Sequence, residues 1–216
     1  MWSCQVDWCF ASKMLMVRRG LRMCVIVAVA LALGATMATA DARVIDVEHS
    51  TLTVHAFKAG LFAAFADNHV IRAPIADGHV SGVGVLAVDV TVHTAEMRVV
   101  DPTLPADKRA EVQARMHGPE VLDSSHYPDI RFASTRVDPD GTDQWRVTGD
   151  LTLHGVTRPL TFAVTRREGH FRGSASIRQR DFGIQPISVV GGTVKVKDEL
   201  RVEFDIVPRR GAAPDR

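Results

Sequence analysis

Residues 145–164, WRVTGDLTLHGVTRPLTFAV, decide the fold, because two runs with alternating apolar residues flank a short turn that contains glycine. The apolar residues take every second position, as they do on one face of a β-strand. His154-Gly155-Val156-Thr157 supplies the turn, with Gly155 at positive φ, and Pro159 marks a strand start or a sheet edge. The stretch therefore predicts an antiparallel β-hairpin, whose single apolar face carries Trp145, Val147, Gly149, Leu151 and Leu153 on one strand and Leu160, Phe162 and Val164 on the other.

The amino-terminal segment, residues 1–40, has the features of a secretory signal peptide. An arginine-rich stretch at 18–22 precedes an apolar run at 23–33, and Ala38-Thr39-Ala40 offers the small residues that a signal peptidase recognises. The run is shorter than the roughly 20 residues that cross a bilayer, so we expect no transmembrane anchor in the mature chain. Residues before Met14 fit no part of a signal peptide and indicate a later translation start. We expect a periplasmic protein that is cleaved after Ala40.

Composition excludes several classes of function. Cys4, Cys9 and Cys24 all precede the expected cleavage site, so the mature chain has no cysteine for a disulfide, a thiolate metal ligand or a nucleophile. The whole chain has 26 Lys and Arg residues against 25 Asp and Glu residues, which gives no electrostatic footprint for nucleic acid. Residues 41–216 suit one domain with a sizeable core. The sequence leaves a homodimer open.

Most of the remaining chain reads as short strands. Residues 43–58 form two strands broken near His49-Ser50, a turn follows at Ala76-Asp77-Gly78, and residues 59–68 are apolar without a period of two, which predicts a helical turn. Further strands are predicted at 83–93, 129–137, 170–178 and 199–207.

A single helix is predicted at 105–117, PADKRAEVQARMH, with Gly118-Pro119 as its stop signal. It is mostly polar, so we expect it across an opening or a side of a barrel rather than inside a core. Many strands with one helix predict an all-β fold, either a closed antiparallel barrel or a sandwich.

Four motifs together resemble the YceI-like family in their order and spacing. They are SSHYPDIRFASTRV (124–137), the hairpin at 145–164, Arg180-Asp181-Phe182-Gly183-Ile184 and Lys197-Asp198-Glu199-Leu200. The resemblance covers nearly all of residues 41–216. It implies a lipocalin-like antiparallel β-barrel of about eight strands with one helix, secreted to the periplasm, whose elongated apolar interior holds a polyisoprenoid chain.

One segment departs from the better-described members of that family. Residues 61–82, LFAAFADNHVIRAPIADGHVSG, are more similar to a branch with a His-x-His or His-Asp-His pattern. Here Asp67 replaces the first histidine, which leaves Asp67-Asn68-His69. The resemblance therefore supports the predicted fold more strongly than it supports the identity of the ligand.

The apolar strand faces suggest a ligand site, since a barrel of about eight strands has room for a slender ligand. A packed core without a cavity predicts the same alternation. For a ligand, we expect an apolar wall and a polar mouth. The predicted wall residues are Phe57, Phe132, Trp145, Val147, Leu151, Phe162 and Val164, and the predicted mouth carries Phe62, Phe65, Asp67, Asn68, His69 and Arg72.

Two classes of function stay open. The first is a non-enzymatic lipid-binding protein that holds a polyisoprenoid, a prenyl quinone or another apolar lipid. The second is a metal-dependent or redox accessory protein that uses the Asp67 and His69 region, with His79 as a further ligand. The histidines lack the spacing of a dedicated metal site, and no nucleophile motif or cofactor-binding loop is present, so the sequence assigns no metal, cofactor or catalytic residue.

Overall fold

The predicted hairpin is present in the computed structural model as β8 (Gln144–Leu153) and β9 (Val156–Arg167). The turn is shorter than expected, because Val156 and Thr157 already pair with Leu153 and Thr152. Its two central residues, His154 and Gly155, have φ angles of 51° and 72°. A two-residue turn with positive φ at both positions matches the right-handed twist of the flanking strands.

The structure describes residues 42–59, 68–81, 87–189 and 194–209. The predicted signal peptide at 1–40 lies outside the described residues. The same holds for most of the predicted helical turn, with Phe62, Phe65 and Asp67. Across the described residues, no helix is long and apolar enough to cross a membrane.

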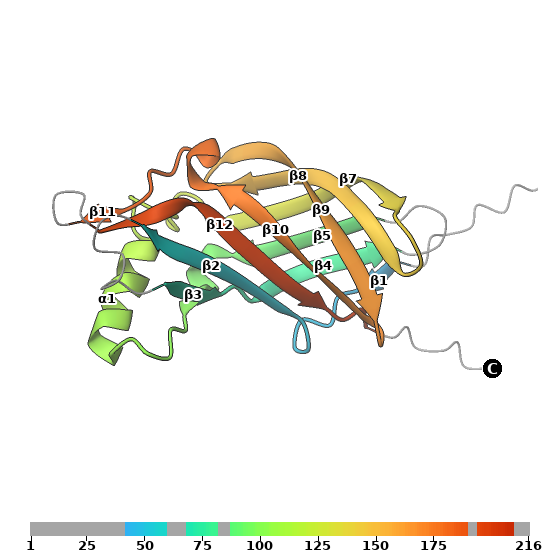
Figure 1. Ribbon diagram of the computed structural model, residues 1–216, viewed down its shortest axis with the longest axis horizontal. Coiled ribbons are helices and arrows are strands. Elements are labelled where there is room, and N and C mark those ends of the chain that lie inside the picture. Colours follow the sequence, from blue (N-terminus) through green and yellow to red (C-terminus); the bar gives the residue numbers. More distant parts are fainter. Residues whose placement is uncertain (1–41, 60–67, 82–86, 190–193, 210–216) are drawn as a thin grey trace, which may run out of the picture. The chain divides into compact units, whose positions relative to one another are not determined.

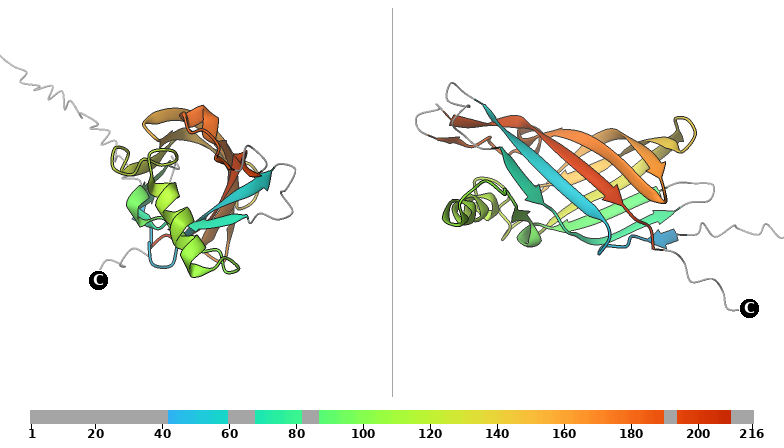
Figure 2. Two further views of the ribbon diagram at one scale, coloured as in Figure 1. Left: turned by 90° about the vertical axis from the view of Figure 1, so that its left-hand side faces the viewer. Right: turned by 60° about the horizontal axis from the view of Figure 1, so that its bottom comes forward.

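The strands form one antiparallel sheet in the order β1-β4-β5-β7-β8-β9-β10-β12-β2-β3-β6, and β11 pairs with β12 (Figure 1). Strands β3 and β4 are consecutive in the chain but lie near opposite ends of this order, because β3 pairs with β2 while β4 pairs with β5. Residues 69–81 therefore connect the two ends of the sheet. A bridge between Ile45 and Pro208 links the chain after β1 to the chain after β12. The sheet therefore curls into a barrel, as the view along its axis shows (Figure 2, left). The other strand bounds are β1 (Ala42–Val44), β2 (Thr51–Ala59), β3 (His69–Arg72), β4 (Ile75–Ser81), β5 (Ala87–His93), β6 (Arg98–Val99), β7 (Asp129–Pro139), β10 (His170–Arg178), β11 (Ser188–Val189) and β12 (Val194–Ile206).

The all-β antiparallel barrel with one α-helix is confirmed, but the predicted count of about eight strands is too low. Eleven strands lie in the continuous order, and β11 is additional. The difference comes from the short strands β1 and β6 and from a break at Ala73-Pro74 that separates β3 from β4. Pro74 has no N–H for the ladder, and β3 ends before it.

The turn predicted at Ala76-Asp77-Gly78 is wrong, because these residues lie within β4. The pairing of β4 with β5 shifts by one residue between Ile75 and Asp77, which is a β-bulge. A glycine is required at position 78 because neighbouring atoms leave no room for a side chain, and not because the chain turns there. A Cβ atom there would lie 2.6 Å from Cδ1 of Ile45 and 2.8 Å from the carbonyl oxygen of Asp89.

The helix α1 (Ala106–His117) forms where it was predicted and lies across one end of the barrel (Figure 2, left). Gln113 attaches it to the chain around β6: its Oε1 accepts from the N–H of Val99 at 2.7 Å, and its Nε2 donates to the carbonyl of Met97 at 2.7 Å. Met116 is the buried residue of the helix. The polar composition fits this position, because most of the helix surface faces solvent.

An ion-pair cluster joins β10 to β12 on the outer surface. Asp205 contacts Nδ1 of His170 and Nε of Arg172, each at 2.7 Å. Burial opposes ionisation of the Asp205 carboxyl, but the hydrogen bonds from Arg172 and His170 outweigh it, so the pKa lies below its ordinary value of 3.8.

Candidate ligand-binding site

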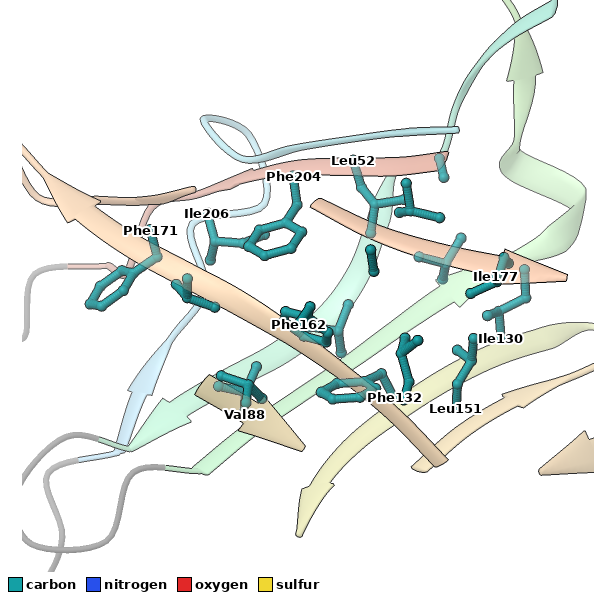
Figure 3. A pocket seen from close by; sticks show the side chains of 18 of the residues that line it. Leu52, Val88, Ile130, Phe132, Leu151, Phe162, Phe171, Ile177, Phe204 and Ile206 are labelled. Atoms are coloured by element: carbon teal, nitrogen blue, oxygen red, sulfur yellow. The ribbon is translucent and has the colours of Figure 1, made fainter. Parts of the chain in front are cut away.

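An apolar cavity of about 190 Å³ lies inside the barrel (Figure 3). The inward-facing residues of β8 line it because alternation places every second side chain on the same face. The same rule supplies residues from the other long strands, and the lining contains no polar side chain. The lining residues are Leu52, Val54, Ala73, Val80, Val88, Val90, Val92, Met97, Ile130, Phe132, Val137, Trp145, Val147, Leu151, Leu153, Leu160, Phe162, Val164, Phe171, Ala175, Ile177, Val202, Phe204 and Ile206.

Three phenylalanine rings form a row within this cavity. The ring of Phe162 lies 5.3 Å from that of Phe132 and 5.4 Å from that of Phe204, centroid to centroid. Both distances are in the range of favourable tilted or edge-to-face contacts. Two strand glycines make room for the outer rings, because a Cβ at Gly149 would lie 2.5 Å from Cζ of Phe132 and one at Gly173 would lie 2.5 Å from Cζ of Phe204. The glycines therefore fix where the rings lie.

Six of the seven predicted wall residues line this cavity together: Phe132, Trp145, Val147, Leu151, Phe162 and Val164. Phe57 does not. On β2 the buried positions are Val54 and Ala56, so Phe57 has the opposite orientation. Its ring instead stacks on His55 at 6.4 Å and lies 6.0 Å from Nζ of Lys197.

A second cavity, of about 300 Å³, lies between α1 and the barrel strands. Val54 and Met97 line both cavities, so the two spaces adjoin. The second cavity is also mainly apolar, but charged and polar side chains border it. Its lining residues are Val54, Ala56, His69, Ile71, Met97, Val99, Glu111, Val112, Arg115, Met116, Val121, Leu122, Gln179, Ile187, Lys195, Val196 and Leu200.

His69 borders this second cavity with a fixed ring orientation. Its Nδ1 lies 2.7 Å from Oδ2 of Asp101, whose other carboxyl oxygen accepts from the N–H of Val70 in a short hydrogen bond. Asp101 is only 1% exposed, and its own carbonyl accepts from Arg109 of α1 at 3.1 Å. With Nδ1 donating to the carboxylate, Nε2 is the ring nitrogen that remains for another partner.

The other described mouth residues do not converge with His69. Arg72 is exposed, because it alternates with the buried Ile71 on β3, and it lines neither cavity. Asn68 accepts a hydrogen bond from the N–H of Lys58 at 3.1 Å. Phe62, Phe65 and Asp67 lie outside the described residues. His79, considered as a second metal ligand, is exposed on β4, and the described part of the chain holds no group of three or more potential metal ligands.

Three sequence motifs meet beside the α1 end of the barrel and have a structural role. The ring of His154, in the hairpin turn, lies 4.3 Å from that of Tyr127, and its Nδ1 lies 3.3 Å from the carbonyl oxygen of Phe182. A Cβ at Gly155 would lie 2.6 Å from the Tyr127 ring. His154 is half-buried by these contacts. Close by, Nδ1 of His126 lies 2.9 Å from Oδ1 of Asp123.

Sequence reasoning missed much of both cavities. The inward faces of β5, β10 and β12 were visible as alternation, yet the predicted wall contained only hairpin residues and two phenylalanines on other strands, Phe57 and Phe132. No sequence pattern connected Asp101 with the site, because its partner His69 is 32 residues away. The second cavity depends on Val112 and Met116 of a helix whose composition is mostly polar.

Comparison with known proteins agrees with the fold. A UPF0312 protein of Pseudomonas putida is 38% identical over 87 residues, which cover 35% of this chain and 45% of that protein. The chain spans about half the length of the curated relatives it matches.

Two solved structures share the fold. The first is Burkholderia cenocepacia BcnA, with a TM-score of 0.59 at 18% identity over 75% of this chain and 98% of that one. The second is a polyisoprenoid binding domain from Saccharophagus degradans, with a TM-score of 0.51 at 13% identity over 76% and 95%. The model of the YceI-like domain matches residues 44–207, and the chain therefore belongs to the YceI-like family.

Proposed function

We propose that this protein is a non-enzymatic binding protein for a polyisoprenoid or a prenyl quinone, which it holds inside the barrel. The observation that carries the proposal is the cavity of about 190 Å³ lined by apolar side chains alone. A structural relative of the same family fold is described as a polyisoprenoid binding domain, which supports the choice of ligand class.

The size of the site supports an elongated ligand. Small-molecule sites usually occupy roughly 300–1,000 Å³. The barrel cavity alone is smaller than that, whereas the barrel cavity and the adjoining cavity beneath α1 reach this range together. A slender chain that passes Val54 and Met97 would occupy both. Met97 suits this place, because its unbranched thioether adapts to different shapes.

The chemistry of the lining sets the driving force. At about 0.8 kcal/mol for each buried CH₂ group, a five-carbon isoprene unit contributes roughly 2–4 kcal/mol before ordering costs. Micromolar binding needs about 8 kcal/mol, in addition to several kcal/mol for immobilising the ligand. About four isoprene units therefore suffice, and no catalytic group is needed.

The proposal includes export. The segment 1–40 carries an arginine-rich start, a short apolar run and a small-residue cleavage site, which support cleavage after Ala40 and a periplasmic location. In that compartment a barrel of this kind would shield an apolar chain from water during storage or transfer.

Titration of the processed protein with a prenyl quinone tests the proposal. Trp145 is the only tryptophan in residues 41–216, and it lines the cavity, so its fluorescence reports on occupancy. We expect saturable quenching with one ligand for each barrel, and calorimetry should give a negative heat-capacity change from apolar burial. An unchanged Trp145 signal together with no heat of binding would refute the proposal.

A further inference from the structure

The ladder between β9 and β10 closes only part of the space between them. It ends at the pair Ala163–Ser174, although both strands continue beyond that pair. Among the described residues, no backbone pairing joins residues 156–162 to residues 175–178. The outer neighbours of the two strands, β8 and β12, do pair with them over these same residues. The barrel wall therefore has an open seam, which we define as residues 156–162 of β9 and residues 175–178 of β10.

Pro159 is one reason why the ladder stops. The N–H of Arg166 donates to the carbonyl of Asp143 at 2.8 Å, so Arg166 directs its backbone groups to the β8 side. Successive residues of a strand direct these groups to opposite sides, and the register of β9 with β8 has no shift, so Thr157, Pro159 and Thr161 direct theirs toward β10. Proline has no N–H and cannot donate across the seam. The sequence itself therefore weakens pairing at this place.

The open seam borders the barrel cavity. Leu160 and Phe162 of β9 and Ala175 and Ile177 of β10 all line that cavity. Contacts between apolar side chains, and not ladder hydrogen bonds, therefore close this part of the wall. Such side chains can move past an apolar ligand without leaving hydrogen-bonding groups unpaired, whereas passage through a complete ladder would break its bonds.

Arg158 connects the two sides of the open seam. On the β10 side, the chain continues into the short helix η3 (Gln179–Phe182). Nε of Arg158 donates to the carbonyl of Asp181 in this helix at 3.0 Å, and Nη1 donates to the carbonyl of Thr157 at 3.4 Å. One exposed side chain therefore joins β9 to η3 where backbone pairing is missing.

We propose that the open seam is a lateral portal, through which an apolar chain enters the barrel cavity between β9 and β10. The portal opens when Arg158 releases Asp181 and the pair Ala163–Ser174 separates, and it closes when both contacts form again. The next pair of the ladder contains Gly173, which has no side chain to pack across the strands and so favours separation. The proposal rests on the proposed function, because a portal matters only if the cavity takes up a ligand.

A disulfide across the last pair of the ladder tests the portal. Residues 41–216 contain no cysteine, so an engineered pair forms the only disulfide of the processed protein. The double variant Ala163→Cys and Ser174→Cys changes two exposed residues that are directly paired, and paired Cα atoms lie about 4.5–5.5 Å apart, which a disulfide can span. Stopped-flow fluorescence of Trp145 measures the association and dissociation rates of geranylgeraniol with this disulfide oxidised and reduced.

We expect oxidation to lower both rates at least about fivefold, because gating steps limit the passage of ligands. The equilibrium affinity should stay within about twofold, because the disulfide restrains the passage and not the empty or the occupied state. Reduction should restore both rates. Intact-mass measurement confirms that the disulfide has formed.

A matched disulfide on the other side of β9 is the control. Thr148 and Thr161 are paired between β8 and β9, and their hydroxyl oxygens lie 3.0 Å apart. The double variant Thr148→Cys and Thr161→Cys therefore restrains β9 without restraining the seam. Its rates should be the same when it is oxidised and when it is reduced.

A substitution without any disulfide tests the contact of Arg158. Arg158→Gln should raise both rates about threefold, which is the size expected for the loss of one exposed hydrogen bond. Arg167→Gln is its control, because Arg167 is an exposed arginine of the same strand within the paired part of the ladder. The control should leave both rates unchanged.

The outcomes separate the portal from the proposed function. Normal binding with rates that the oxidised seam disulfide leaves unchanged, or that the control disulfide lowers equally, would overturn the portal and leave the apolar site intact. Rates unchanged by Arg158→Gln would overturn the role of its contact with Asp181. Failure of the parent protein to bind any prenyl probe would overturn the proposed function itself. Melting curves and the unchanged affinity for geranylgeraniol check that each variant is folded.

Discussion

Of two substitutions on the same face of β8, the smaller should destabilise the protein more than the larger if the barrel contains an open cavity. Gly149 and Leu151 are two residues apart, so both positions lie on the inward face of β8. Gly149→Ala adds one methyl group toward the Phe132 ring, whereas Leu151→Trp adds an indole toward the cavity. In an ordinary packed core the larger residue would be the more harmful.

The structure gives the magnitude for Gly149→Ala. The new Cβ would lie 2.5 Å from Cζ of Phe132 and 2.7 Å from Cα of Ser134, and it would also contact the carbonyl oxygen of Ala133. Two of these three atoms belong to the backbone, so they cannot rotate away. Overpacking typically costs 1–3 kcal/mol, against a gain of about 0.4–1 kcal/mol from the smaller entropy of the unfolded chain. We expect a net loss of about 1–2 kcal/mol, equivalent to a fall of roughly 2–8 °C in Tm for a domain of this size.

Leu151→Trp should be close to neutral. It adds about six non-hydrogen atoms, and the cavity of about 190 Å³ accommodates them even if each takes the roughly 30 Å³ of a liquid water molecule. Denaturant unfolding of the apo protein measures both variants, with Leu151→Ala as a control that should cost about 2–5 kcal/mol. A loss for Leu151→Trp larger than that for Gly149→Ala would refute the reasoning, because it would show that the interior is filled.

Three further predictions concern other parts of the chain. Gly155→Ala should lower the free energy of unfolding, measured by denaturant titration, by about 1–3 kcal/mol. The reason is that Gly155 has a positive φ and a Cβ there would clash with the Tyr127 ring. A neutral effect would contradict the structural role of that contact. The lowered pKa of Asp205 gives stability that is complete above the ordinary value of 3.8 and is lost as pH falls through the lower folded-state pKa. Asp205→Asn should therefore destabilise by less than about 1 kcal/mol near neutral pH, and the difference from the parent should shrink below pH 3.8; a difference that grows in acid would contradict this sign. Mass spectrometry of the secreted protein should give an amino terminus at Asp41, and retention of residues 23–33 would contradict cleavage.

It was predictable which hairpin residues face inward, because strict alternation fixes the face of every residue once the register is set. A slip of one residue inverts every side chain, and the apolar residues of 145–164 fit only one register. Trp145 and Phe162 accordingly line the cavity. The residues Thr51–Ala59 are different, because apolar residues occur at both parities, so Phe57 was placed on the wrong face while Val54 and Ala56 are the buried ones.

Other features depend on contacts that sequence patterns do not encode. Gly78 resembles a turn residue, yet its role is to admit Ile45 and the backbone of β5. The cavity beneath α1 arises from the position of a helix whose sequence is mostly polar, so its volume was not predictable. Asp101 is a single acidic residue in an irregular segment, and only the fold brings it to His69.

The central claim is that the barrel interior holds an isoprenoid, and lipid extraction followed by mass spectrometry of the processed protein tests it most directly. The protein should be purified from the periplasm without detergent, together with Leu151→Trp as the filled-cavity variant. We predict about one isoprenoid for each parent barrel and much less in the variant, although both are folded. Parent protein that carries no isoprenoid, or that carries it at the same level as Leu151→Trp, would contradict the claim.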